Sequence, residues 1–453
     1  MQLCAASFTT SSPNLPPDLK IDAFKGKSPM THEFSRPGPS PKKENAARVL
    51  EPETIAANAG VGQDPAFRSI APALHLSATY GWADPTEKPP FDYSRSGNPT
   101  RAQLEDVLAG LEGAARGVVT STGMAAIDLV LTLVSPGDLV LAPHDCYGGT
   151  HRLLSARGRK GHFDVAFIDQ TDPQALEHAF ARNPKLVLIE TPSNPLLRIT
   201  DIEAVVARAR KVGALTVADN TFLSPALQQP LALGCDIVVH STTKYINGHS
   251  DVVGGAVLAR DASLGEELAW WANCTGVTGS PFDAYQTLRG VRTLHTRIER
   301  QQSTAHEIAL RLAEDPRVAR VYYPGLEDHP GHALAARQQR GFGAMLSLEF
   351  TDGIDPVKAL RGLNIFTVAE SLGGFESLVC CPAAMTHASM PAEARAKAGI
   401  SDQLIRLSIG LEHVEDLWAD ISSAMGDAQV DDVNGEHFAF QFKQSESLAS
   451  VGT

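Results

Sequence analysis

The residues that could do chemistry in this sequence are polar side chains that come directly after short apolar runs. Lys244 follows the run 237–239 and a hydroxyl-rich stretch, and Asp219 ends the run "ALTVAD". An amine at one strand end and a carboxylate at another suit pyridoxal phosphate. Its aldehyde forms a Schiff base with a lysine, and its ring nitrogen needs an acid to stay protonated. Taken singly, Lys244 also fits a surface lysine and Asp219 a helix N-cap, so this interpretation needs further partners.

Three other features supply partners for such a cofactor. The stretch "STGMAA" places Gly123 and Met124 at the start of a helical pattern. The first backbone N–H groups of a helix and its dipole attract an anion such as a phosphate. Ser241 and Thr243, just before the lysine, would add hydroxyl hydrogen bonds, and Tyr147 in "DCYGGT" would stack on the ring. Each feature is weak alone, and their agreement favours the cofactor.

The elements that must position these residues alternate between helix and strand from about residue 100 to 260. Short apolar runs such as "DLVLAP", "KLVLIE" and "CDIVVH" are separated by helical patterns such as "DIEAVVARARKVG". This alternation predicts an α/β fold with a mostly parallel sheet that is covered on both faces. In such sheets ligands bind at the carboxyl ends of the strands, so the polar clusters there are expected to converge on one crevice. After about residue 300, alternating runs such as "GAMLSLEF" predict a smaller α/β domain with an antiparallel sheet.

Composition and charge exclude several kinds of partner. The formal charge of −13 argues against nucleic acid or an anionic membrane. No apolar run reaches the roughly 20 residues that span a bilayer. The six cysteines lack C-x-x-C spacing, and His144, His240 and His249 match no familiar ligand set, so we expect no metal. Few cysteines in a long chain favour a reducing cytoplasm.

The two ends of the chain differ from its middle. Residues 1–53 are rich in Ser, Pro and Lys without a helical or strand period, which predicts a disordered extension. A transit peptide is the alternative. Residues 428–453 also lack a packing pattern and are expected to form a flexible tail.

A series of motifs resembles one family closely. The motifs "YSRSGNPT", "APHDCYGGTHRL", "ETPSNPLLRI", "ADNTFLSPALQQPLALG" and "HSTTKYINGHSDVVGG" resemble those of the Cys/Met metabolism enzymes, over about residues 54–425. These enzymes depend on pyridoxal phosphate and have the aminotransferase-like fold (fold type I). Two stretches, "WWANCTGVTGSPFDAYQTLRGVRTL" and "GISDQLIRLSIGLE", resemble the bacterial cystathionine γ-synthase branch of the family.

The resemblance assigns roles position by position. Lys244 would bind the cofactor covalently and move protons, Asp219 would pair with its ring nitrogen, and Tyr147 would stack on the ring. The phosphate would be held by residues of two subunits, namely Gly123, Met124, Ser241 and Thr243 of one and Tyr93 and Arg95 of its neighbour. The substrate would be bound by polar residues around the crevice, namely Arg406, Ser371, Asn194, Arg152 and Glu370.

The resemblance also implies an organisation and an activity. Residues 54–100 would reach a neighbouring subunit, 101–300 would form the cofactor domain and 301–427 the small domain. The assembly would be a homotetramer, a dimer of dimers with shared active sites. The expected reaction is γ-replacement of an O-acylhomoserine, with O-succinylhomoserine as the expected ester, by cysteine to give cystathionine. A cystathionine γ-lyase, an O-succinylhomoserine sulfhydrylase and an inactive homologue acting as a binding protein are the alternatives.

Overall fold

The computed structural model describes residues 50–64, 66–388 and 390–429. The predicted N-terminal extension (1–53) and C-terminal tail (428–453) lie almost wholly outside these residues. The described helices and strands run from Pro52 to Asp427. Among them, no helix is both long and apolar enough to cross a bilayer.

The larger sheet of the described chain has seven strands in the order β1-β7-β6-β5-β4-β2-β3. These strands are β1 (Arg116–Thr120), β2 (Leu139–Pro143), β3 (Asp164–Ile168), β4 (Leu186–Glu190), β5 (Leu215–Asp219), β6 (Ile237–His240) and β7 (Gly255–Ala259). From β6 to β3 all neighbours are parallel, and β7 is antiparallel to β1 and β6. The predicted α/β fold with a mostly parallel sheet is confirmed.

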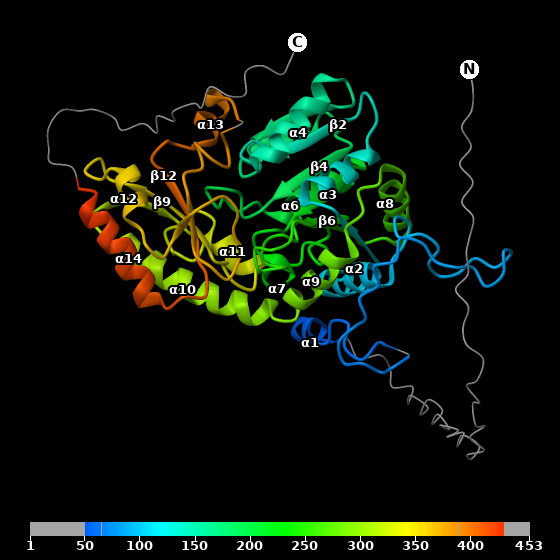
Figure 1. Cartoon of the computed structure of the whole chain (residues 1–453). Coiled ribbons are helices and arrows are strands. Elements are labelled where there is room, and N and C mark those ends of the chain that lie inside the picture. Colours follow the sequence, from blue (N-terminus) through cyan, green and yellow to red (C-terminus); the bar gives the residue numbers. More distant parts are fainter. Residues whose placement is uncertain (1–49, 65, 389, 430–453) are drawn as a thin grey trace, which may run out of the picture. The chain divides into compact units, whose positions relative to one another are not determined.

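Helices cover both faces of this sheet (Figure 1). Alternate residues of a strand point to opposite faces, so Leu141 and Val140 of β2 belong to different apolar cores. The core around Leu141 includes residues of α2 (Pro99–Glu112), α5 (Pro173–Phe180), α6 (Ile202–Val212) and α9 (Pro281–Val291). The core around Val140 includes residues of α3 (Gly123–Val130), α4 (Gly148–Arg159) and α8 (Ala262–Thr275).

A smaller sheet follows, with five strands in the order β10-β11-β12-β9-β8. Its strands are β8 (Val318–Tyr322), β9 (Met345–Phe350), β10 (Thr367–Val368), β11 (Leu378–Cys380) and β12 (Leu404–Ser408). All neighbours are antiparallel except β10 and β11. The remaining described elements are α1 (Pro52–Ala57), η1 (Leu131–Leu133), α7 (Ser224–Leu227), α10 (Leu294–Glu314), α11 (His332–Gln338), α12 (Pro356–Gly362), α13 (Ala392–Ala398) and α14 (Val414–Asp427).

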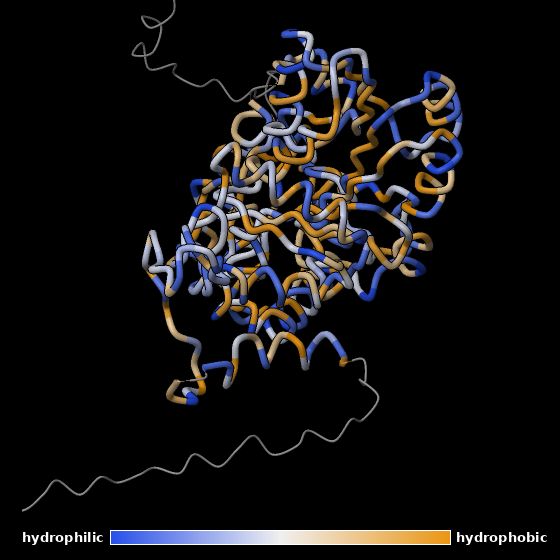
Figure 2. Tube along the Cα trace, turned by 90° about the vertical axis from the view of Figure 1, so that its right-hand side faces the viewer, coloured by the Kyte–Doolittle hydropathy of each residue, from blue (hydrophilic) through white to orange (hydrophobic). Residues whose placement is uncertain are grey.

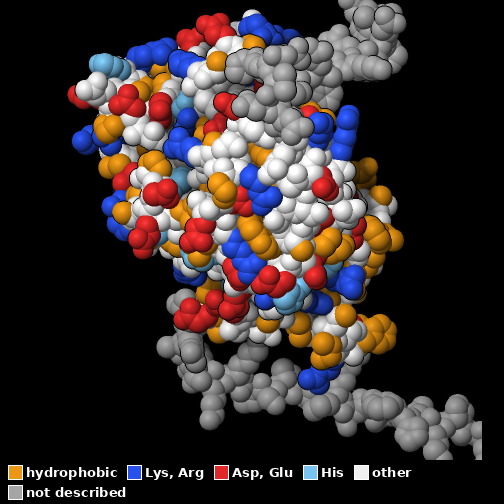
Figure 3. All heavy atoms as spheres, turned by 90° about the vertical axis from the view of Figure 1, so that its left-hand side faces the viewer, with side chains coloured by type: hydrophobic (Ala, Val, Ile, Leu, Met, Phe, Trp, Pro, Cys, Tyr) orange, Lys and Arg blue, Asp and Glu red, His pale blue; other side chains and the backbone are white. Residues whose placement is uncertain are grey.

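The smaller sheet shares its apolar core with loops of the larger one. This core includes residues of α10, α14 and the small sheet, together with Leu197, Phe222 and Tyr245 from loops that follow β4, β5 and β6. Figure 2 shows apolar, orange segments running through the middle of the fold and hydrophilic, blue ones in its outer loops. On the side of the smaller sheet, acidic and basic side chains are mixed over the surface (Figure 3). The two sheets are therefore joined by a common core.

The segment between α1 and α2 exposes several large apolar side chains. Phe67 is 87% exposed, Ile70 73% and Leu76 65%. Soluble domains seldom leave large apolar side chains grouped in water unless something binds them. This segment falls within residues 54–100, which the family resemblance predicts to contact a neighbouring subunit.

Candidate active site

A cavity of about 350 Å³ lies where β4, β5 and β6 end, between the two sheets. Its walls include the strand-end residues Glu190, Asp219 and His240. Most of the site residues expected from the sequence line it, namely Gly123, Met124, Tyr147, Asn194, Asp219, Ser241, Thr243, Lys244, Glu370, Ser371 and Arg406. Segments as far apart as α3 and β12 thus meet at one place, as the strand-end rule predicts.

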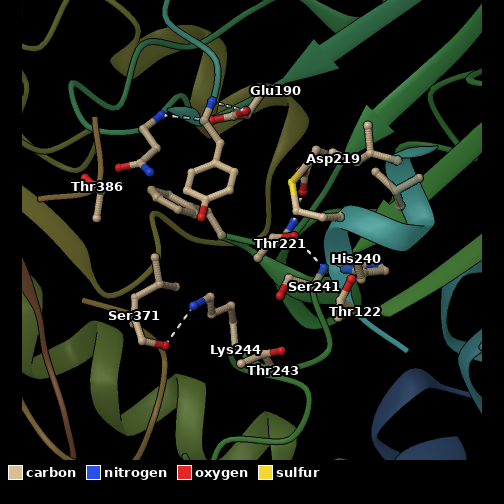
Figure 4. A pocket seen from close by; sticks show the side chains of 18 of the residues that line it. Thr122, Glu190, Asp219, Thr221, His240, Ser241, Thr243, Lys244, Ser371 and Thr386 are labelled. Atoms are coloured by element: carbon tan, nitrogen blue, oxygen red, sulfur yellow. Dashed lines mark hydrogen bonds between the residues drawn. The ribbon is translucent and has the colours of Figure 1, made fainter. Parts of the chain in front are cut away.

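Lys244 lies four residues beyond β6 and is partly buried. Its Nζ donates a hydrogen bond of 2.7 Å to Ser371 Oγ, from the loop after β10 (Figure 4). Burial lowers the pKa of Lys244 to about 8, and the nearby Arg406 guanidinium adds to this effect. Ser371 has a φ of 90°, a conformation that is costly for a residue other than glycine and that clusters at ligand sites. The amine is therefore held in place, and a larger fraction of it is neutral near pH 7 than in an ordinary lysine.

Two carboxyl groups stand beside each other at the strand ends. Glu190 ends β4 and Asp219 ends β5, and the two are register partners. Burial raises the pKa of Asp219, while a backbone N–H donated by Thr221 and the charge of His240 act in the opposite direction. Burial also raises the pKa of Glu190 well above its usual range, and the neighbouring Asp219 charge adds to it. A positive group bound near these two carboxyls would favour their ionised forms, so the pair suits a cationic part of a ligand.

The start of α3 forms the opposite wall. The Thr122 side chain caps the helix by accepting from the Ala125 N–H at 2.9 Å. A Cβ on Gly123 would come within 2.7 Å of Ser241 Cβ, so only glycine allows this approach of helix and loop. The Gly123 and Met124 N–H groups have no carbonyl of their own helix to bind. They therefore suit an anion.

Tyr147 and the two glycines after it form a third wall. The Tyr147 backbone N–H donates to Glu190 Oε2 at 2.9 Å. A Cβ on Gly149 would lie 2.5 Å from Tyr147 Cε1, and one on Gly148 would lie 2.6 Å from the Thr386 carbonyl oxygen. Gly149 therefore leaves room for the Tyr147 ring, and Gly148 allows the close approach of the Thr386 backbone. The ring is 38% exposed and lines the cavity.

Arg406 brings the smaller sheet into the site. This buried residue of β12 donates from Nη1 to Asn194 Oδ1 at 2.8 Å and from Nη2 to the Ser371 carbonyl at 3.0 Å. Its Nε is buried and has no hydrogen-bond partner among the described residues. A buried guanidinium with a donor to spare suits a ligand carboxylate.

Three predicted site residues do not line this cavity. Arg152 is exposed on α4, beyond the cavity wall. Arg95 donates from Nε to Asn273 Oδ1 at 3.1 Å, and its guanidinium lies 5.4 Å from the centre of the Tyr93 ring. Tyr93 is 48% exposed. The exposed Tyr93–Arg95 pair is compatible with a role in the site of another subunit.

Sequence reasoning missed several cavity residues. Glu190 is the last residue of the run "KLVLIE", whose pattern predicts only a buried strand. Thr221 donates its backbone N–H to Asp219 and accepts from the Ser241 N–H at 2.9 Å. His240 binds Glu112 at 2.7 Å (Nε2 to Oε1) in a fully buried pair. The available signal for Glu190 and His240 was that each is an ionisable residue at the end of an apolar strand.

The family profile described as Cys/Met metabolism PLP-dependent enzyme matches residues 53–426. This chain belongs to that family. A family relative, cystathionine gamma-synthase of Escherichia coli (strain K12), is 54% identical over 373 residues, which cover 82% of this chain and 96% of the relative. Cystathionine beta-lyase of Lactococcus lactis subsp. cremoris (strain MG1363) is 44% identical over 376 residues, covering 82% and 98%.

A solved structure of the family shares both fold and sequence with this chain. It is cystathionine gamma synthase from Xanthomonas oryzae pv. oryzae in complex with aminoacrylate and cysteine, with a TM-score of 0.83 and 58% identity. The match covers 84% of this chain and 98% of that one. The resemblance seen in the sequence motifs is confirmed, and fold type I with it.

Enzymes of the Cys/Met metabolism family depend on pyridoxal phosphate, and the cavity of this member fits that cofactor. Lys244 supplies an amine, the Asp219 carboxyl suits a protonated ring nitrogen, and the start of α3 suits a phosphate. The volume is also sufficient, since small-molecule sites commonly measure about 300–1,000 Å³.

Proposed function

We propose that this enzyme is a cystathionine γ-synthase. In the proposed reaction the cysteine sulfur forms a bond to Cγ of O-succinylhomoserine, the Cγ–O bond breaks, and succinate leaves with cystathionine as the product. The observation that carries the proposal is the identity of 54% and 58% to two γ-synthases over almost their whole length, against 44% to a β-lyase.

Pyridoxal phosphate, when bound, supplies a protonated ring that draws electrons away from the substrate's Cα. We assign Lys244 to its aldehyde, Asp219 to its ring nitrogen and Tyr147 to its ring face. We assign binding of the phosphate to Gly123, Met124, Ser241 and Thr243. The Thr243 hydroxyl accepts from the Gly254 N–H at 2.9 Å and donates to the Gly254 carbonyl at 3.2 Å, so its proton would turn from that carbonyl to a phosphate oxygen.

Lys244 Nζ is the base that this geometry supports best. A pKa of about 8 leaves the amine partly neutral near pH 7, so that it can accept a proton from Cα and return it to a neighbouring carbon. Ser371 Oγ accepts from Nζ and sets its position. A base whose pKa lies near the working pH is efficient in both directions of proton transfer.

Arg406 is the proposed clamp for the substrate α-carboxylate, with Asn194 and Ser371 holding the guanidinium. Glu370 lines the same cavity and would face the distal part of the substrate. The preference for the succinyl ester rests on Arg152, which stands outside the cavity of its own chain. The test therefore compares the succinyl and acetyl esters.

We further propose that the active sites are shared in a homotetramer. The exposed apolar side chains of the segment 66–98, together with Tyr93 and Arg95, support this assignment. Tyr93 and Arg95 would reach the phosphate of a neighbouring subunit and complete its site.

The test supplies purified enzyme with O-succinylhomoserine or O-acetylhomoserine, each alone, with cysteine or with sulfide, and identifies the products. Cystathionine formation that depends on cysteine supports the proposal. Rapid release of 2-oxobutanoate that cysteine does not suppress, without cystathionine, would instead identify a lyase. Homocysteine formed from sulfide in preference to cystathionine would identify a sulfhydrylase. The Lys244→Ala variant gives the background, and absence of turnover in the parent enzyme as well would mark an inactive homologue.

A further inference from the structure

A second cavity, of about 720 Å³, lies between the two sheets, and no step of the proposed reaction uses it. It borders the loop that follows β3, the edge strand of the larger sheet, where Gln170 and Thr171 line it. The segment after β4 divides the two cavities. Asn194 of this segment lines the active site, whereas Arg198 lines the second cavity. The second cavity is thus also at the carboxyl edge of the sheet, where ligands of α/β folds bind.

The wall of this cavity carries an excess of positive charge. Arg198, Arg208 and Arg320 line it together with Asp201. Asp201 is occupied elsewhere, because it caps α6 at the Ala204 N–H and forms an ion pair of 2.7 Å with Arg337. Arg198 is paired with Asp145 at 2.9 Å.

Arg208 and Arg320 have no ion pair within the part of the chain that the structure describes. Arg208 lies one helical turn after Ala204 on the cavity face of α6 and donates only to the Ala204 carbonyl. Arg320 and Tyr322 lie two residues apart on the edge strand β8, so they share one face. The Arg320 guanidinium lies 4.7 Å from the centre of the Tyr322 ring. Two cations are therefore left to a ligand.

The rest of the wall offers a neutral donor and an apolar surface. Burial lowers the pKa of His329 to about 4, so this imidazole is neutral at pH 7. Its Nδ1 accepts the Gly331 N–H at 3.0 Å, which leaves the proton on Nε2 as a donor. Apolar side chains complete the lining, namely Leu176, Leu196, Ile199 and Leu334.

We infer that this cavity binds a small organic anion, with a carboxylate or phosphate group held between Arg208 and Arg320 and an apolar body against the leucines. The site is also connected to the active site. Arg198 binds Asp145, and Asp145 accepts from Ser193 Oγ at 2.7 Å. Asp145 is two residues from Tyr147, and Ser193 is next to Asn194.

The experiment titrates the cofactor-loaded enzyme with phenyl phosphate and with phenylacetate, and follows heat of binding. These probes join an apolar ring to a phosphate or a carboxylate, so the ratio of their dissociation constants tells which anion the site prefers. Inorganic phosphate and benzyl alcohol each carry one half of the proposed ligand and are expected to bind at least about tenfold more weakly. The variants are Arg208→Gln, Arg320→Gln and their combination, with Arg361→Gln of α12 as the matched surface control.

We expect saturable binding of one of the two anionic probes, at one site per chain. Each single variant should weaken it by about tenfold, the loss typical of a hydrogen bond to a charged group. Arg361→Gln and Arg406→Lys should leave it unchanged, since these residues lie outside the cavity. The inference is overturned if neither probe binds by about 1 mM, if the double variant binds as well as the parent, or if benzyl alcohol binds equally well. The two single Arg208 and Arg320 variants, their combination and Arg361→Gln should all still form product. Such activity shows that a loss of probe binding is not a loss of fold.

Discussion

Glu190 and Asp219 end two neighbouring parallel strands in register, and the Asp219 charge adds to the burial that raises the pKa of Glu190, while burial raises the pKa of Asp219. The larger part of each shift comes from burial. A positive ring nitrogen beside Asp219 would relieve both effects. This relationship makes the stability of the cofactor-free protein depend on the same carboxylate that the loaded enzyme needs.

Asp219→Asn is therefore expected to stabilise the cofactor-free protein and to weaken the cofactor-loaded enzyme. The folded-state pKa of Asp219 is raised, so its ionisation destabilises the cofactor-free protein at pH 7, and this cost disappears as pH falls towards the unfolded-state value. The cofactor-free variant should accordingly unfold at higher denaturant than the parent at pH 7. With saturating cofactor the order should reverse, and kcat should fall by about 10²-fold or more. Equal stabilisation of parent and variant by the cofactor would contradict the assigned pairing.

Lys244→Met should abolish turnover and stabilise the cofactor-free protein at pH 7. The folded-state pKa of about 8 lies below the ordinary 10.5, so the folded chain resists protonation of this amine. The loss of folding free energy caused by the buried, charged amine is complete below pH 8 and vanishes as pH rises towards 10.5. Its upper limit is about 3 kcal/mol. Denaturant unfolding of both proteins across this range measures it, with Lys358→Met as a control. A stability difference that does not change with pH would refute the burial of a charged amine.

Gly123→Ala is expected to weaken cofactor binding with little effect on the fold elsewhere. The new Cβ would collide with Ser241 Cβ and Cα, at 2.7 and 2.9 Å, and overpacking of this kind costs about 1–3 kcal/mol. Cofactor affinity, followed by absorbance, should fall by roughly 10- to 100-fold. Gly110→Ala, whose Cβ would meet Ile55 at an ordinary 3.5 Å, is the matched control. Affinities that are alike in the two variants would remove α3 from the phosphate site.

Arg406→Lys should raise KM for the amino-acid substrate more than it lowers kcat. A lysine cannot hold Asn194 and the Ser371 carbonyl while also offering Nε to a carboxylate. The loss expected for hydrogen bonds to a charged group is about 1.5–3 kcal/mol, or roughly 10- to 100-fold in kcat/KM. Arg361→Lys should leave both constants unchanged. A kcat effect alone, at constant KM, would count against a role in substrate binding.

Mixed oligomers test the shared site. Arg95→Ala and Lys244→Ala are each expected to be nearly inactive, and together they should regain activity, because one of the two sites in a hybrid pair then has both residues. Random pairing of equal amounts restores roughly a quarter of the parent sites. Activity that stays at the level of the single variants would place Arg95 in the site of its own chain or outside the site.

The sequence predicted what local patterns control. Continuous apolar runs located β2, β4 and β6, and the strand-end rule then brought Lys244 and Asp219 to one crevice. Glu190 ends its strand just as Asp219 does, but it was counted with the apolar run and therefore missed.

Other features depend on contacts that no local pattern contains. The bonding of Thr243 to Gly254 exists because the chain turns back before β7. The unoccupied donor on Arg406 depends on Asn194, 212 positions away. The second cavity joins Arg208 of helix α6 to Arg320 of strand β8, so its charge excess could not be predicted from spacing in the sequence.

The apolar core that contains both Tyr245 and the smaller sheet has a consequence for heat inactivation. Tyr245 is fully buried in that core and is the direct neighbour of Lys244. A cut in the chain between α9 and α10 would divide this core between two fragments, because Tyr245 precedes the cut and the smaller sheet follows it. Catalysis and the docking of the two sheets should therefore be lost at the same temperature, in one transition, and neither part is expected to survive as a module that could be grafted elsewhere.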